Sequence, residues 1–152
     1  GINLQYRIAG DGPLRSQLEQ QAADLGLRDE VSFLGFVSDT AEFLANVDLF
    51  AMPSLYEGLG VAALEAMAAG KAVIATRVGG LSESVIDGVT GILIPPRDPK
   101  ALAEAIAKLV RTPDLAVAMG KQGRERVLQY FTLERMATQN ESFYYEILGA
   151  PA

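Results

Sequence analysis

Cysteine and histidine are both absent from the 152 residues of this sequence. Without cysteine there is no disulfide framework and no thiolate chemistry. Without histidine the chain lacks the commonest general base and the usual ligand of a zinc site. Catalysis within this chain would therefore have to use Asp, Glu, Lys, Arg or backbone groups, and we expect neither a metal site nor a cofactor.

Long apolar runs and an excess of positive charge are also missing. No run reaches the roughly 18–20 apolar residues that span a bilayer, and no basic segment followed by an apolar one marks a secretory signal. The net charge of −6 disfavours binding to nucleic acid or to an anionic membrane through this segment. We expect a cytoplasmic protein, which a further domain could hold at the cytoplasmic face of a membrane.

Short apolar runs that suit β-strands alternate with helical patterns along the chain. We expect strands at residues 4–9, 31–34, 48–52, 72–76 and 91–94, and helices at 13–25, 61–69, 80–86 and 132–148. Capping residues Asp39, Asp98 and Thr112 open the remaining helices. The alternation predicts an α/β fold, a Rossmann-like doubly wound parallel sheet of about five strands with C-terminal helices, in one domain over residues 1–152.

The stretch "YEGLGVAALEAMAAGKAVIAT", residues 56–76, contains a glycine turn between the third expected strand and the helix at 61–69. Unpaired backbone N–H groups and the helix dipole favour an anion at such a helix start, and Gly58 and Gly60 would let a phosphate approach the backbone. Glycine turns also precede helices for packing reasons alone, so both interpretations remain open.

Two glutamates, Glu57 and Glu65, flank this turn. Carboxylates repel phosphate but accept hydrogen bonds from hydroxyl groups, so a diphosphate with a ribose on one side and a sugar on the other matches their spacing. Apolar residues surround Glu65, which predicts a helix buried all round and a carboxylate in need of a partner. The alternative is that Glu57 stabilises a turn and that Glu65 faces solvent.

The same stretch resembles the Glu-x7-Glu signature of the group 1 family of retaining glycosyltransferases, which have the two-domain GT-B fold. "YRIAGDGPLR", "VSFLGFV", "DLFAMPSLYEG" and "VGGLSESVIDGVTGILIPPRDPKALAEAI" are similar, in the same order, to other segments of that family. The resemblance covers nearly the whole chain. It implies one half of a GT-B fold, the C-terminal domain that binds the nucleotide sugar.

The resemblance also implies roles for particular residues. Glu57 would bind donor-sugar hydroxyls and help to stabilise positive charge at the anomeric carbon, and Glu65 would bind the ribose hydroxyls. The backbone at Gly60 and Val61 would meet the distal phosphate. The other donor-binding residues would be those of the same turn, of the nucleobase site and of the cleft edge: Gly58, Leu59, Val37, Asp39, Gly10 and Gly12.

One of these assignments, that of Asp39 to the nucleobase site, has a simpler alternative. The spacing of Asp39 and Glu42 is that of a helix capping box, which already explains Asp39. Gly79 and Gly80 are interpreted only as a turn between a strand and a helix. In the last helix, we expect Leu133, Met136, Phe143 and Ile147 to form the apolar side.

The family pattern begins before the first residue of this sequence. A strand ending in Gly-Arg, with a Lys soon after it, precedes the "YRIAGDGP" segment in the family and binds the diphosphate. We therefore expect a truncated donor half, inactive alone, in which the strands at 4–9 and 48–52 either pair directly or leave a gap. A rearranged sheet, a swapped oligomer or reduced stability would follow.

The expected reaction moves a hexose from a UDP-, GDP- or ADP-linked sugar to an acceptor hydroxyl, with an N-terminal acceptor domain of the same enzyme as partner. Two alternatives stay open. One is a non-catalytic nucleotide-binding or scaffolding module. The other is a related GT-B enzyme such as a sugar-nucleotide epimerase.

Overall fold

The computed structural model describes residues 4–149, and the chain divides into two compact units, Gly1–Phe43 and Leu44–Ala152. The α/β class with parallel strands is confirmed in both units. The strands, however, form a two-stranded and a three-stranded sheet in place of one sheet of about five. Within the described residues, the first strand pairs with the second in one unit, and the third pairs with the fourth in the other.

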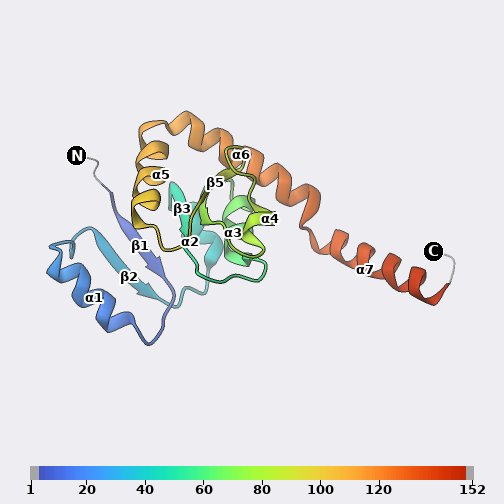
Figure 1. Ribbon diagram of the computed structural model, residues 1–152, viewed down its shortest axis with the longest axis horizontal. Helices are drawn as coiled ribbons and strands as arrows, with labels where there is room; N and C mark the ends of the chain where they lie inside the picture. Colours follow the sequence, from blue (N-terminus) through green and yellow to red (C-terminus); the bar gives the residue numbers. More distant parts are fainter. Residues whose placement is uncertain (1–3, 150–152) are drawn as a thin grey trace. The chain divides into compact units, whose positions relative to one another are not determined.

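The first unit contains two parallel strands and one crossover helix (Figure 1). Strand β1 (Tyr6–Ala9) pairs with β2 (Val31–Gly35), and helix α1 (Arg15–Asp24) connects them. The helix begins two residues after Pro13 and ends before Gly26, whose φ of 71° closes it as expected. None of the residues of α1 is buried, so the helix packs loosely on its small sheet.

The second unit is built on strands β3 (Leu49–Met52), β4 (Ala72–Thr76) and β5 (Gly91–Ile94), in that order across the sheet. The central strand β4 is buried at every residue. Its alternating side chains face two helical layers, which is why the strand is apolar on both sides. On one face, buried residues of the sheet and of two helices form a core cluster: Ala72, Ile74, Ile94, Ala105, Leu109 and Met119.

Helix α2 (Thr40–Ala45) spans the sequence boundary between the two units. Five helices surround or follow the three-stranded sheet: α3 (Val61–Ala68), α4 (Leu81–Ser84), α5 (Pro99–Arg111), α6 (Pro113–Tyr130) and α7 (Leu133–Leu148). The backbone N–H of Glu42 donates to Asp39 Oδ1 at 2.8 Å, which confirms the cap at α2. Asp98 caps α5 in the same way, with Ala101 N–H as donor at 2.9 Å. The expected side-chain cap by Thr112 is wrong, because its hydroxyl donates backward to the carbonyl of Lys108.

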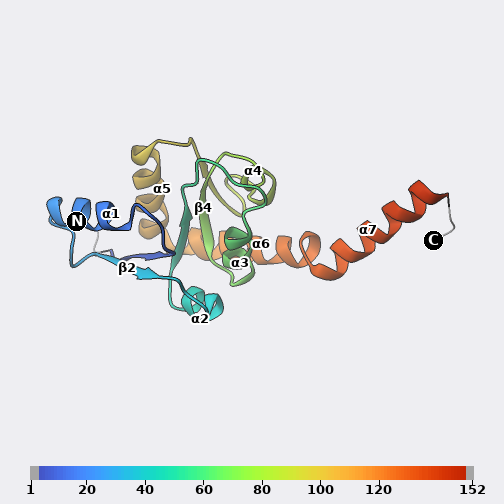
Figure 2. The same ribbon diagram turned by 90° about the horizontal axis from the view of Figure 1, so that it is seen from below.

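Helix α7 follows α6 at the carboxyl end of the chain (Figures 1 and 2). Thr132 caps its start, accepting from Arg135 N–H at 3.2 Å. None of the α7 residues that the structure describes is buried, and the expected apolar side is exposed, with Leu133 at 75% and Ile147 at 63%. Among residues 4–149, none of the helices is both long enough and apolar enough to cross a membrane.

Candidate functional site

The turn between β3 and α3 lies at the carboxyl edge of the three-stranded sheet, where ligands bind in α/β proteins. Its start is tied to the neighbouring strand, because the buried hydroxyl of Thr76 at the end of β4 donates to the carbonyl of Ser54. Its end is Gly60, which caps α3 in the left-handed region with a φ of 77°. Residues 57–62, which are the glycine turn and the first two residues of α3, are the candidate site turn.

Two glycines from the connection between β4 and α4 lie against this turn. The N–H of Gly80 donates to the carbonyl oxygen of Gly58 at 2.8 Å. A Cβ at Gly79 would overlap the carbonyl oxygen of Glu57, and a Cβ at Gly80 would overlap that of Gly58. The sequence had suggested only a strand-to-helix turn here. The adjacent glycines were the available signal, but a close approach to a segment 22 residues away could not be read from them.

The backbone N–H groups of Leu59, Gly60, Val61 and Ala62 have no acceptor within residues 4–149, and neither do those of the preceding residues 54–58. The carbonyl of Gly60 already accepts the first helical bonds, from Ala63 and Leu64. Free N–H groups of this kind, at a helix N-terminus with positive dipole, are the usual protein site for a phosphate. Leu59 and Val61 are exposed and Ala62 is half-buried, whereas Gly60 between them is buried.

Glu57 and Glu65 differ in their surroundings. Glu57 is half-buried, and Ser54 Oγ lies 3.5 Å from its Oε2. Glu65 is exposed on α3, in one line with the exposed residues Val61 and Ala69. The expectation of a helix buried all round is therefore wrong. Only the opposite side of α3 is buried, because small and apolar residues there face the sheet and α6: Ala63, Leu64, Ala66 and Met67.

The other sequence-predicted residues belong to the first unit. Gly10 and Gly12 follow β1, and the N–H of Gly10 donates to the carbonyl of Gly35 at 2.7 Å. Val37 follows β2 and is half-buried. Asp39 is exposed, and one oxygen of its carboxylate caps α2, which is the simpler of its two interpretations. The structure thus brings Glu57–Val61 and Glu65 together in one unit and the remaining candidates together in the other.

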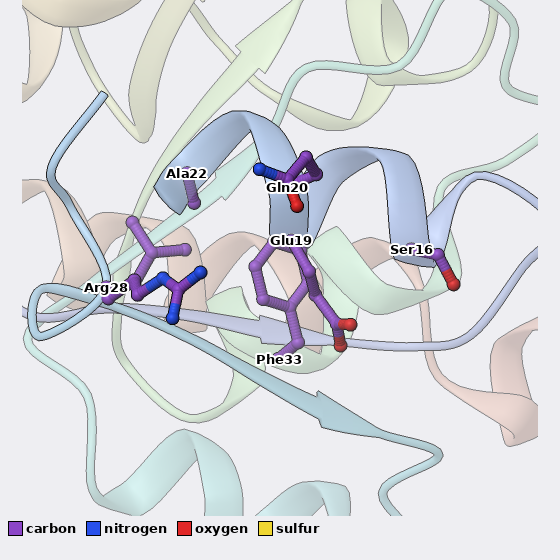
Figure 3. Close-up of a pocket in the computed structure, with 7 residues that line it drawn as sticks. Ser16, Glu19, Gln20, Ala22, Arg28 and Phe33 are labelled. Atoms are coloured by element: carbon purple, nitrogen blue, oxygen red, sulfur yellow. The ribbon is translucent and has the colours of Figure 1, made fainter. Parts of the chain in front are cut away.

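The structure has a cavity in each unit, and neither is lined by Glu57, Glu65 or Asp39. The larger, about 460 Å³, lies in the first unit, and Figure 3 shows the side chains of α1 and β2 that line it. It flanks the body of a helix that buries none of its residues, so we attribute it to loose packing. The smaller, about 220 Å³, lies at the carboxyl ends of β3, β4 and β5, between Leu55, Thr76 and Arg97. Within the described residues, no group of three or more acidic side chains gathers as a metal site would require.

The family follows from residues 1–126, which match the model of the glycosyl transferases group 1. The chain belongs to this family, and its structural neighbours are the C-terminal domains of GT-B glycosyltransferases.

Individual relatives and neighbours agree with this membership. The chain is 36% identical over 147 residues to N-acetyl-alpha-D-glucosaminyl L-malate synthase of Bacillus anthracis, covering 97% of this chain and 39% of that protein. It is 39% identical over 146 residues to the GDP-mannose-dependent alpha-(1-6)-phosphatidylinositol monomannoside mannosyltransferase of Mycobacterium tuberculosis, covering 90% and 38%. The structure of HepE from Anabaena in complex with UDP-glucose superposes with a TM-score of 0.88 at 30% identity, covering 93% of this chain and 41% of HepE. The chain therefore spans about two fifths of the length of these proteins.

Proposed function

We propose that this chain is the domain that binds the nucleotide sugar in a retaining glycosyltransferase. The whole protein would transfer a hexose from a nucleoside diphosphate to an acceptor hydroxyl. The observation that supports this most directly is the row of four free N–H groups at residues 59–62, flanked by the carboxylates of Glu57 and Glu65.

The chemistry of these groups matches the three parts of such a donor. The free N–H groups would bind the distal phosphate, the exposed Glu65 would accept hydrogen bonds from ribose hydroxyls, and Glu57 would accept them from the sugar. As the bond to the diphosphate breaks, positive charge develops at the anomeric carbon, and the Glu57 carboxylate would stabilise it. Catalysis would consist of positioning and charge stabilisation, without a metal ion.

The relatives support a nucleotide sugar as the donor, but they do not indicate which nucleobase it carries. HepE was solved with UDP-glucose, and the mycobacterial relative is named as dependent on GDP-mannose. We therefore keep UDP-, GDP- and ADP-linked sugars as candidate donors. The partner in catalysis would be an N-terminal acceptor domain, which would select the acceptor.

Isothermal titration of the 152-residue chain with UDP, GDP and ADP tests the proposal, with the corresponding nucleosides as controls. We expect one diphosphate to bind at least about tenfold more tightly than its nucleoside, because the phosphate contacts would supply at least about 1.4 kcal/mol. Equal binding of nucleoside and diphosphate would contradict a phosphate site at the turn. No binding of any nucleotide would favour the alternative of a scaffolding module.

A further inference from the structure

Ser84 is a buried polar residue at the end of α4, with 0% of its surface exposed. Its hydroxyl oxygen lies 2.8 Å from the carbonyl oxygen of Gly80 and 3.2 Å from that of Leu59. A hydroxyl has one proton to donate, so the two carbonyls share it. The contact with Gly80 lies within one helical turn, whereas the contact with Leu59 joins α4 to the site turn.

Arg126, on α6, holds the end of α4 from the other side. Its Nε donates to the carbonyl of Ser84 at 2.9 Å, and a terminal nitrogen donates to that of Glu83 at 2.8 Å. The guanidinium also lies over the ring of Tyr130, 5.3 Å from its centroid. These are carbonyls at the end of a four-residue helix, which has few internal bonds of its own. The planar fork of arginine suits this two-point contact, which a single ammonium could not reproduce.

These contacts determine where two amides of the site turn point. A trans peptide is planar, and its C=O and N–H point in opposite directions. The carbonyl of Gly58 is directed at Gly80 N–H, so the N–H of Leu59 points away from α4. The carbonyl of Leu59 is directed at the Ser84 hydroxyl, so the N–H of Gly60 also points away from α4. Both N–H groups belong to the row without acceptors in the described residues.

We propose that Ser84 and Arg126 are positioning residues, which turn the Leu59 and Gly60 amides outward to meet the diphosphate. Ser84 holds the Leu59 carbonyl directly, and Arg126 holds Ser84 and α4 in place. That the ligand is a diphosphate rests on the proposed function, whereas the orientation of the Leu59 and Gly60 amides does not. Neither residue would touch the nucleotide, and neither lies in the Glu-x7-Glu stretch.

The test compares Ser84→Ala and Arg126→Lys with Ser82→Ala as the matched control. Ser82 is an exposed serine of the same helix, and its hydroxyl has no hydrogen bond in the described part of the chain. Residual dipolar couplings of the Leu59 and Gly60 N–H vectors report orientation, and titration with UDP and uridine reports the phosphate contribution. Arg126→Lys keeps the positive charge but loses the two-point contact. This variant provides the test of the proposal if Ser84→Ala does not fold.

We expect Ser84→Ala to change both couplings and to reduce the preference for UDP over uridine about tenfold, as for the loss of one hydrogen bond to a charged group. Arg126→Lys should shift both measurements in the same direction, and Ser82→Ala should leave them unchanged. A purely structural role would lower the melting temperature without changing that preference, and this result would overturn the proposal. Unchanged couplings in both variants would overturn it as well. If the unaltered chain shows no preference for UDP, the proposed function fails, while the couplings still decide whether Ser84 and Arg126 orient the turn.

Discussion

The backbone N–H of Gly80 lies 2.8 Å from the carbonyl oxygen of Gly58, and this bond joins two glycine turns that are 22 residues apart. The space between them accommodates no side chain, because a Cβ at Gly80 would overlap that carbonyl oxygen. Gly58 is different, since it is exposed and a Cβ there would meet no atom within 4 Å. The two glycines therefore serve separate purposes, and substitution distinguishes them.

Gly80→Ala should destabilise the protein, by about 2 kcal/mol or more, because the new methyl group forces the two turns apart. Gly58→Ala should change the free energy of unfolding by less than about 0.5 kcal/mol, yet weaken UDP binding about tenfold by keeping the phosphate from the backbone. Urea unfolding followed by circular dichroism, with UDP titration, measures both. A stable Gly80→Ala variant would contradict the close approach, and normal UDP binding by Gly58→Ala would contradict the phosphate position.

The two glutamates should separate catalysis from binding in a full-length enzyme that contains this domain. Glu57→Ala should lower kcat at least about 100-fold, because it removes charge stabilisation at the reacting centre. Glu65→Ala should mainly raise KM for the donor, about tenfold, because it removes hydrogen bonds to hydroxyl groups. Since Glu65 is exposed, its replacement should leave the melting temperature unchanged. Steady-state kinetics with saturating acceptor gives both constants. If both variants had the kcat and KM of the unaltered enzyme, the assignment of Glu57 and Glu65 to the donor site would be wrong.

Asp87 should make stability depend on pH. The Leu93 N–H donates to Asp87 Oδ1 at 2.9 Å, and Arg77 pairs with Oδ2 at 2.7 Å. The Leu93 bond first, and the Arg77 partner as well, hold the pKa of Asp87 below its usual value. A carboxyl whose pKa is lower in the folded state stabilises the protein above its unfolded pKa of about 3.9, and this stabilisation disappears as the pH falls through the folded value.

Asp87→Asn should therefore cost stability at pH 7 and cost progressively less as the pH falls below about 4. The loss at pH 7 should be about 1 kcal/mol or less, because the side chain is 46% exposed and its ion pair is screened by solvent. Urea unfolding at pH 7 and pH 3 measures it. Glu125→Gln, at an exposed position of α6 without a side-chain bond in the described residues, is the control for loss of a negative charge. An equal loss for Asp87→Asn at both pH values would show that the charge is not involved.

Truncation after Thr132 should leave the second unit folded. None of the α7 residues that the structure describes is buried, and the core cluster lies in the sheet, α5 and α6. We expect the melting temperature to change by no more than about 3 °C, which corresponds to roughly 1 kcal/mol for a domain of this size. The far-UV helix signal should fall with the lost helix. A larger drop in melting temperature would mean that α7 packs against the core in solution.

Much of the local structure could be predicted because it depends on neighbours in the sequence. Periodicity placed β4 and β5 at the residues where the structure has them, and proline with an N-cap carboxylate placed the start of α5 at Pro99. The glycine turn before α3 was also evident, because a left-handed N-cap at Gly60 suits glycine. Errors arose where a group had more than one available partner or where packing against other elements decided exposure. Thr112 bonds backward to Lys108, and α3 exposes Glu65 although nearly every neighbour of Glu65 is apolar.

By itself, the sequence determined the α/β class, the order of strands and helices, the family and the pair of glutamates around a glycine turn. All of these depend on residue identity and on spacing over a few turns of the chain. Only the tertiary structure decided which side of α3 is buried, and that Gly79, Gly80 and Ser84 lie against the site turn while Arg126 bonds the end of α4. The reason is physical. The N–H and the C=O of one peptide unit point in opposite directions, so the group that binds the C=O sets the direction of the N–H. In the site turn, the groups that bind the C=O come from other elements of the fold.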